Sequence, residues 1–242
     1  HDPAIRVAMK LVAAAKLQDA QFIEALKQEC RHLSQLRHPN IVGFRDLILE
    51  KYQIAMVMDL LKGQNLAEYL QKKRMNADEV VSVLEAILSG LGYAHQLGVL
   101  HRDIKPSNIL IDQAGMVLLA DFGSASPMTQ LPQNDSIGSG AIAYTAPEVL
   151  QGQESSPATD FYSIGMVLYA MLQGRGPGAG VTVSELRDSI LSPSEWDLRF
   201  SKEVPRQVVS LCRAMIAKDP SSRLTDPAVV LNLIEKAAKP RR

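Results

Sequence analysis

The sequence predicts an α+β fold in two lobes: a small lobe of one sheet and one helix, followed by a larger, mainly helical lobe. Residues 1–58 carry strand patterns around a single amphipathic helix pattern, whereas most residues after 63 follow helical spacing. We therefore expect a first lobe over residues 1–58, a hinge over 59–63 and a second lobe over 64–242.

The first lobe is expected to contain a strand over 5–12, a helix over 19–37 and two strands over 41–49 and 52–58. Apolar residues recur at helical spacing in the second of these segments: Phe22, Leu26, Cys30, Leu33 and Leu36. That helix must end before Pro39, because the residue ahead of a proline is pushed out of the helical region.

The second lobe is expected to be built from helices. Asn76 and Glu79 have capping-box spacing and predict the start of a helix that Gly98 ends. Further helices are predicted over 159–172, 183–190, 206–217 and 226–239. Residues 124–140 are rich in Ser, Pro, Gln and Gly, a composition typical of a long surface loop.

The composition is that of an ordinary globular protein. Of the 242 residues, 46% are hydrophobic and 21% are charged, and 26 basic residues balance 26 acidic ones. This balance disfavours a general nucleic-acid or membrane-surface binder. The two cysteines, Cys30 and Cys212, are far apart in the sequence, which disfavours a disulfide scaffold and fits a cytoplasmic location. The longest strongly apolar run, residues 164–172, is too short to cross a bilayer.

Most of the chemical information lies in His101-Arg102-Asp103-Ile104-Lys105-Pro106-Ser107-Asn108, followed by Asp121-Phe122-Gly123. Asp103 can accept a hydroxyl proton, and Lys105 can stabilise a moving phosphoryl group. Asn108 and Asp121 supply oxygen ligands of the kind that Mg²⁺ prefers. Residues 108–111 and 116–120 have a hairpin pattern with a turn at 112–115, which would return Asp121 to the side of Asn108.

In this strand context the two motifs resemble those of eukaryotic-type (Hanks-type) Ser/Thr protein kinases. The resemblance covers nearly the whole chain and implies a bilobal kinase-like fold with ATP and Mg²⁺ in the cleft. It implies that Lys10, in Val7-Ala8-Met9-Lys10, holds the ATP phosphates and that Glu29 pairs with it. It further implies nucleotide contacts from the gatekeeper Met58, from the backbone of Asp59 and Leu61, and from Leu110.

The resemblance also implies scaffold contacts around the site. Glu148, in Ala146-Pro147-Glu148, would form a buried ion pair with Arg223, and Asp160 would anchor the backbone of the catalytic loop. A stacked apolar column is implied for Leu33, Phe44, His101 and Phe122. His101 is therefore expected to be a packed residue and not a general base.

Lys105 followed by Pro106 matches the Ser/Thr-specific branch of the family, which implies a protein substrate with a Ser or Thr acceptor. Arg102 occupies the position that often contacts an activation-loop phosphate in the family, and the candidate phosphosites are Thr129, Ser136 and Ser139. An activating kinase, or a second copy acting in trans, would add the phosphate. Neither a nucleic-acid partner nor a membrane segment within this chain is expected.

Two departures from the family pattern concern nucleotide binding and turnover. No Gly-x-Gly-x-x-Gly loop, which covers the ATP phosphates in the family, precedes Lys10. We interpret the N-lobe as incomplete and expect the truncated chain to bind ATP poorly and to be inactive as it stands. Ala141 occupies a position where Ser/Thr kinases usually have a hydroxyl that bridges Asp103 and Lys105.

Three functions are open at this point. The leading one is transfer of the ATP γ-phosphoryl group to Ser or Thr hydroxyls of proteins. The missing Gly-rich loop and Ala141 favour a pseudokinase-like scaffold that binds partners without turnover, whereas four intact groups argue against it: Lys10, Asp103, Asn108 and Asp121. A small-molecule kinase is disfavoured by Glu148 and Arg223, which the family uses in a peptide-docking platform.

Overall fold

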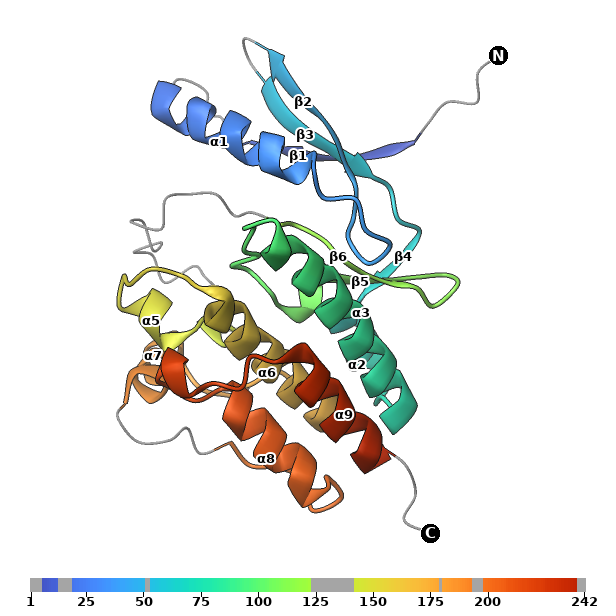
Figure 1. The fold of residues 1–242 in the computed structure, drawn as a ribbon, viewed down its shortest axis with the longest axis vertical. Coiled ribbons are helices and arrows are strands. Elements are labelled where there is room, and N and C mark those ends of the chain that lie inside the picture. Colours follow the sequence, from blue (N-terminus) through green and yellow to red (C-terminus); the bar gives the residue numbers. More distant parts are fainter. Residues whose placement is uncertain are drawn as a thin grey trace.

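Two lobes of different composition are stacked along the long axis of the computed structural model, which describes residues 6–12, 19–50, 53–122, 142–178, 180–192 and 198–238 (Figure 1). The upper lobe holds a three-stranded sheet and one helix, and the lower lobe is helical. A second small sheet lies where the lobes meet. The predicted two-lobed α+β architecture is therefore confirmed.

The upper sheet is antiparallel, with the strand order β1 (Val7–Leu11), β3 (Gln53–Asp59), β2 (Phe44–Glu50). Its central strand β3 is buried over residues 54–57, as expected for a strand paired on both sides. Helix α1 (Ala20–Leu33) begins at Asp19, whose carboxylate accepts a hydrogen bond from the backbone N–H of Phe22. Because a turn follows Leu33, α1 is shorter than the predicted helix over 19–37.

The second sheet has the order β4 (Gly63–Asn65), β5 (Ile109–Asp112), β6 (Val117–Leu119). Strand β4 was not predicted, because Gly-Gln-Asn shows no apolar alternation. A Cβ atom at Gly63 would lie 2.0 Å from the backbone oxygen of Ile111, so the close pairing with β5 requires glycine. The connector expected over 59–63 is therefore shorter and covers residues 60–62, since Asp59 ends β3 and Gly63 begins β4.

In addition to the hinge, a set of hydrogen bonds links the two lobes. The backbone N–H of Leu119 donates to the backbone oxygen of Asn40 over 2.8 Å, and the backbone N–H of Val42 donates to the backbone oxygen of Leu119 over 2.8 Å. The Asn40 side chain also donates to the oxygen of Val117 over 2.9 Å. Residues 40–42 therefore contact β6, and the strand predicted over 41–49 begins only at Phe44.

The lower lobe is built from α2 (Leu66–Lys72), α3 (Ala77–Gln96), α5 (Pro147–Leu150), α6 (Pro157–Gln173), α7 (Val183–Leu191), α8 (Arg206–Met215) and α9 (Pro227–Ala238), with short turns η2 (Pro106–Asn108) and η3 (Pro220–Ser222). The predicted capping box is present, with Asn76 and Glu79 exchanging backbone and side-chain hydrogen bonds. Helix α6 is buried at every residue from Thr159 to Met171 and forms the centre of this lobe.

Candidate active site

Asp160, in the first turn of α6, holds the catalytic loop in place. Its carboxylate accepts hydrogen bonds from the backbone N–H groups of His101 over 3.0 Å and Arg102 over 2.8 Å. The ring of His95 lies 2.8 Å from the same carboxylate. The backbone of Arg102 is left-handed, with φ 64°. Residues other than glycine rarely adopt this conformation, and it persists where the surrounding structure enforces it. The predicted anchoring role of Asp160 is confirmed.

The carboxylate of Asp103 is the centre of the loop. Lys105 Nζ donates to both of its oxygens, over 2.9 and 2.7 Å, and Asn108 Nδ2 donates to Oδ2 over 2.9 Å. Asn108 also donates to the Asp103 backbone oxygen over 2.8 Å. One third of the Asp103 side chain stays exposed, so the predicted acid–base residue is both oriented and accessible.

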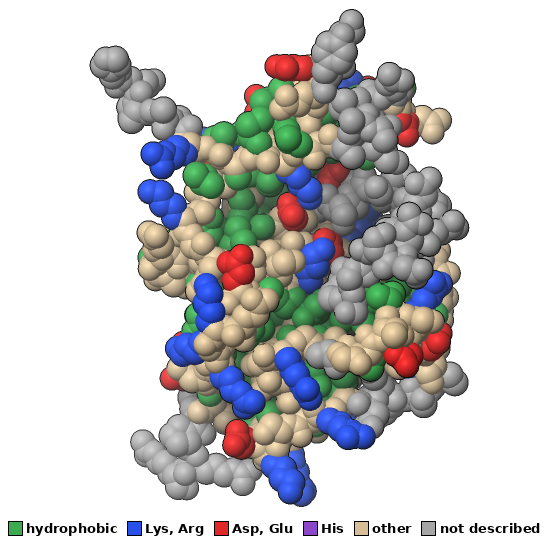
Figure 2. Space-filling view, turned by 180° about the vertical axis from the view of Figure 1, so that it is seen from behind, with side chains coloured by type: hydrophobic (Ala, Val, Ile, Leu, Met, Phe, Trp, Pro, Cys, Tyr) green, Lys and Arg blue, Asp and Glu red, His purple; other side chains and the backbone are tan. Residues whose placement is uncertain are grey.

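The β5–β6 hairpin returns Asp121 to this loop, as predicted. The backbone N–H of Ala120 donates to the Asn108 oxygen over 2.8 Å, and Asp121 follows with a left-handed φ of 58°. From the other lobe, Lys10 Nζ reaches to 3.2 Å from Asp121 Oδ1. Residues from β1, the catalytic loop and the end of β6 thus meet, and the rear face of the molecule is hollowed between the lobes (Figure 2).

The ion pair that the structure shows for Lys10 is therefore with Asp121, whereas the family resemblance implied Glu29. Glu29 lies on the inner side of α1, 9% exposed, beside the buried Cys30. The pairing of Lys10 with Glu29 stays a prediction.

His101 is a packed residue, as expected. Its ring is fully buried, lies 4.5 Å from that of Phe122 between centroids, and has Nε2 3.1 Å from the Ala120 oxygen. Burial lowers the pKa of His101 below its usual value, which favours the neutral ring. Leu33, Phe44 and Phe122 line one small cavity of about 20 Å³ under the sheet, consistent with the implied column.

The residues implied in nucleotide binding surround the hinge. Met58 lies in β3 and lines the same cavity, and Leu110 lies in β5 opposite Asn65 and Leu118. Asp59 ends β3, and Leu61 lies between β3 and β4. Their contacts with a nucleotide stay predictions.

Sequence reasoning missed the ion pair between Arg45 and the hinge residue Asp59. A Cβ atom at Gly43 would lie 2.3 Å from Asp59 Oδ2, so the glycine leaves room for this carboxylate. The pairing depends on the register of β2 against β3, which includes a shift between Phe44 and Asp46. A local sequence pattern carries no signal for such a shift.

Glu148 and Arg223 form the predicted buried ion pair. Two Arg223 nitrogens donate to the two Glu148 oxygens, each over 2.6 Å, and Thr159 donates to the same carboxylate over 2.9 Å. Burial raises the pKa of Glu148, but the Arg223 hydrogen bonds outweigh it and the net pKa is lowered. The pair joins α5 to the segment after η3.

Several predicted features lie outside the described residues: Gly123, the loop over 124–140, Ala141, and the candidate phosphosites Thr129, Ser136 and Ser139. Among the helices that the structure describes, none combines the length and apolar character needed to cross a membrane.

Comparison with known proteins gives one consistent result. The family model of the protein kinase domain matches residues 2–235. The serine/threonine-protein kinase PrkC of Bacillus subtilis (strain 168) is 34% identical over 221 residues, which are 90% of this chain and 34% of PrkC. The serine/threonine-protein kinase PkaB of Streptomyces coelicolor is 34% identical over 230 residues, 90% of this chain and 54% of PkaB. The chain thus spans about a third to a half of the length of these relatives.

Among solved structures, a mutant of the Mycobacterium tuberculosis PknI kinase domain superposes with a TM-score of 0.74 and 24% identity. The superposition covers 96% of this chain and 85% of that one. At this identity the likeness shows the shared fold.

Proposed function

Because the chain belongs to the protein kinase family, we propose that it transfers the γ-phosphoryl group of ATP to Ser and Thr hydroxyls of protein substrates. The observation that carries the proposal is the meeting of Asp103, Lys105 and Asn108 with Asp121 and Lys10. Phosphoryl transfer needs little covalent chemistry from a protein, but it needs positioned charges around an anionic transition state. These five side chains supply one base, two ammonium groups and two oxygen ligands.

The proposed reaction assigns a role to each group. The acceptor hydroxyl oxygen forms a bond to the γ-phosphorus, the bond from that phosphorus to the β–γ bridging oxygen breaks, and Asp103 receives the hydroxyl proton. Lys105, already bound to Asp103, lies where it can stabilise the transferred group. Lys10 would hold the other phosphates, so it must release Asp121 in the loaded enzyme.

The donor set fits Mg²⁺, which the family typically uses and which supplies charge neutralisation at the phosphates. Asp121 offers a carboxylate that is one third exposed. Asn108 donates its amide nitrogen to Asp103, so its carbonyl oxygen is the atom left for a cation. Across the described ranges no three His, Cys, Asp or Glu side chains gather into a metal cage.

The proposal includes substrate and regulation. Lys105-Pro106 and the names of the relatives support Ser/Thr acceptors in proteins. Phosphorylation within 124–140, by another kinase or by a second copy in trans, would add a ligand for Arg102, which the strained loop holds in place. A cytoplasmic location remains part of the proposal.

The test measures phosphate transfer from ATP by the full-length protein with Mg²⁺, with acceptor sites identified by mass spectrometry. Asp103→Asn should lower kcat by about 10²–10⁴-fold, the usual contribution of a positioned base. Asp188→Asn, an exposed carboxylate on α7, is the matched control and should leave the rate unchanged. Nucleotide binding without any transfer would instead support the pseudokinase-like scaffold.

A further inference from the structure

Asp59, where β3 meets the hinge, is tied to the start of β2 by its backbone and by its side chain. The Asp59 backbone N–H donates to the backbone oxygen of Gly43 over 2.9 Å. The carboxylate accepts a hydrogen bond from Arg45 Nε and forms an ion pair with it. The same carboxylate occupies the space that a side chain at position 43 would need, since a Cβ atom there would lie 2.3 Å from Asp59 Oδ2.

Arg45 lies at an irregularity of β2. Phe44 pairs with Met58 and Asp46 pairs with Val57, so the register of β2 against β3 passes over Arg45. Bulges of this kind re-aim side chains and are frequent next to active sites. The residue that the ladder leaves out is thus the one whose side chain contacts Asp59.

The ion pair contributes little to the stability of the upper lobe. The side chains of Arg45 and Asp59 are 46% and 45% exposed, and pairs this open are screened by water. Their contact instead restricts the movement of Asp59, which is the last residue of β3 before the connector over 60–62. A restriction at this point acts on the backbone that is proposed to contact the nucleotide.

A backbone oxygen distinguishes its ligands by the type of hydrogen bond that they can make. It can only accept a hydrogen bond, so at the edge of a purine it favours a base that carries an amino group over one that lacks it. Holding such an acceptor in its bound position before the ligand arrives strengthens this preference, because less freedom is lost on binding.

We propose that Arg45 is a positioning residue for the nucleotide base: by holding the Asp59 carboxylate, it fixes the hinge backbone and strengthens the preference for a 6-amino purine. Gly43 belongs to the same arrangement, because a residue with a Cβ atom would displace the carboxylate. The proposal rests on the ATP binding proposed above and adds to it the side chain that acts on the hinge contact.

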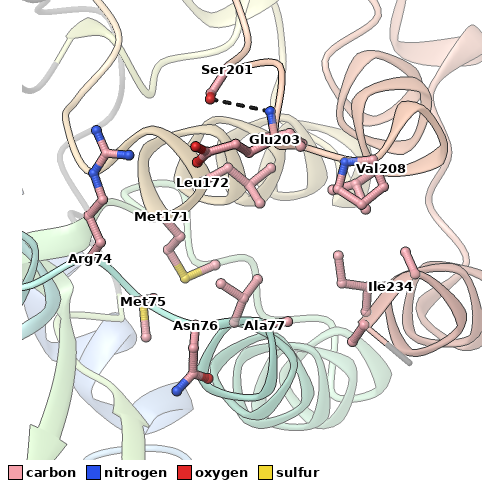
Figure 3. Close-up of a pocket in the computed structure, with 15 residues that line it drawn as sticks. Arg74, Met75, Asn76, Ala77, Met171, Leu172, Ser201, Glu203, Val208 and Ile234 are labelled. Atoms are coloured by element: carbon pink, nitrogen blue, oxygen red, sulfur yellow. Dashed lines mark hydrogen bonds between the residues drawn. The ribbon is translucent and has the colours of Figure 1, made fainter. Parts of the chain in front are cut away.

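A matched control lies at a cavity of about 210 Å³ in the lower lobe. This cavity is enclosed by the residues before α3, the last turn of α6, the residues before α8 and the end of α9 (Figure 3). Arg74 and Glu203 are the charged residues among its lining, and their charges cancel, so the cavity selects no ionic ligand. Arg74→Met removes one exposed positive charge, as Arg45→Met does, but leaves the contacts of Asp59 intact.

Calorimetric titration of the full-length protein tests the proposal with two Mg²⁺-bound nucleotides: ADP, and the diphosphate of purine riboside, which lacks only the 6-amino group. Arg45→Met should weaken ADP binding about two- to fivefold, the range that an exposed ion pair can contribute, and leave the purine riboside diphosphate unchanged. The preference for ADP should therefore fall by the same factor. Arg45→Lys keeps the charge and should restore most of the preference, and Arg74→Met should bind both nucleotides as the parent does.

Gly43→Ala breaks the same contact from the other side. It should lower the preference for ADP to a similar extent, and it carries the test alone if Arg45→Met does not fold. The double variant should lose no more than the more affected single variant, because both changes remove one interaction.

The outcomes separate this inference from the proposed function. A parent protein that prefers ADP, together with variants that keep the preference or weaken both nucleotides equally, would overturn the role of Arg45 alone. A parent protein that binds neither nucleotide would overturn the proposed function, and this inference with it.

Discussion

The ammonium group of Lys10 lies 3.2 Å from Oδ1 of Asp121, so an ion pair links the first strand of the upper lobe to the end of β6. The two side chains are 48% and 34% exposed, and a pair this open contributes little to stability. Its significance is positional, because the partner of Lys10 is the residue proposed to bind metal.

Replacing this lysine should therefore affect catalysis and not folding. Lys10→Met should lower kcat/KM for ATP by about 10²-fold or more, since a charge aimed at the phosphates is lost. The free energy of unfolding should stay within about 0.5 kcal/mol of the parent value. Steady-state kinetics and urea unfolding measure the two effects, with Lys236→Met as control. A large loss of stability would show that the ion pair has a structural role.

The pair of Glu148 and Arg223 should behave in the opposite way. Their side chains are 4% and 0% exposed, so removing one partner leaves a charge buried without its counter-ion. Arg223→Met should cost about 3–5 kcal/mol in the free energy of unfolding. Adding Glu148→Gln should restore part of this loss, because no isolated charge remains. Urea unfolding of the single and the double variant compares their free energies of unfolding, and a double variant no more stable than Arg223→Met would contradict the prediction.

Asp160→Asn should loosen the catalytic loop without unfolding α6. One of its two oxygens would become an NH₂ group facing a backbone N–H, at a cost of about 1–3 kcal/mol. Hydrogen exchange should speed up at the amides of His101 and Arg102 and stay unchanged in α8. Unchanged exchange at those two amides would mean that other contacts hold the loop.

Glu79 should make stability pH-dependent in acid. Hydrogen bonds from Lys73, the Asn76 backbone and Tyr69 lower its pKa from 4.5 to about 2. A carboxyl group whose pKa is lowered in the folded state stabilises the fold at pH values above its pKa in the unfolded state. This contribution is lost as the pH falls from about 5 to 2. Because the group is partly exposed, the loss should be below about 1 kcal/mol. Glu79→Gln should flatten this part of the curve; an unchanged acid slope would refute the assignment.

Two glycine-to-alanine changes should have opposite signs. At Gly165 a Cβ atom would lie 2.6 Å from Ile216 and 2.9 Å from Met215, so Gly165→Ala should push α6 from α8 and cost about 1–3 kcal/mol. At Gly92 on α3 nothing lies within 4 Å, so Gly92→Ala should stabilise the helix by about 0.5–1 kcal/mol. Thermal unfolding compares the two, and shifts of the same sign would disprove the packing argument.

The parts of the site that could be predicted from the sequence are those formed by residues close together along the chain. Asp103, Lys105 and Asn108 lie within one loop, and a single hairpin returns Asp121 to them, so local turn and strand patterns were sufficient. The capping box at Asn76 and the buried helix α6 followed from spacing in the same way. The family resemblance added the distant pair of Glu148 and Arg223, which local patterns do not connect.

The partner of Lys10 could not be predicted in this way, because the ion pair with Asp121 depends on how the upper sheet lies relative to the segment after β6. The tertiary structure also decided the strand β4, whose three polar residues become a strand only where β5 offers its edge, and the cavity between α3, α6, α8 and α9. Each of these features arises from the relative placement of segments far apart in the sequence. Such placement is set by the packing of whole elements, which no local pattern of residues encodes.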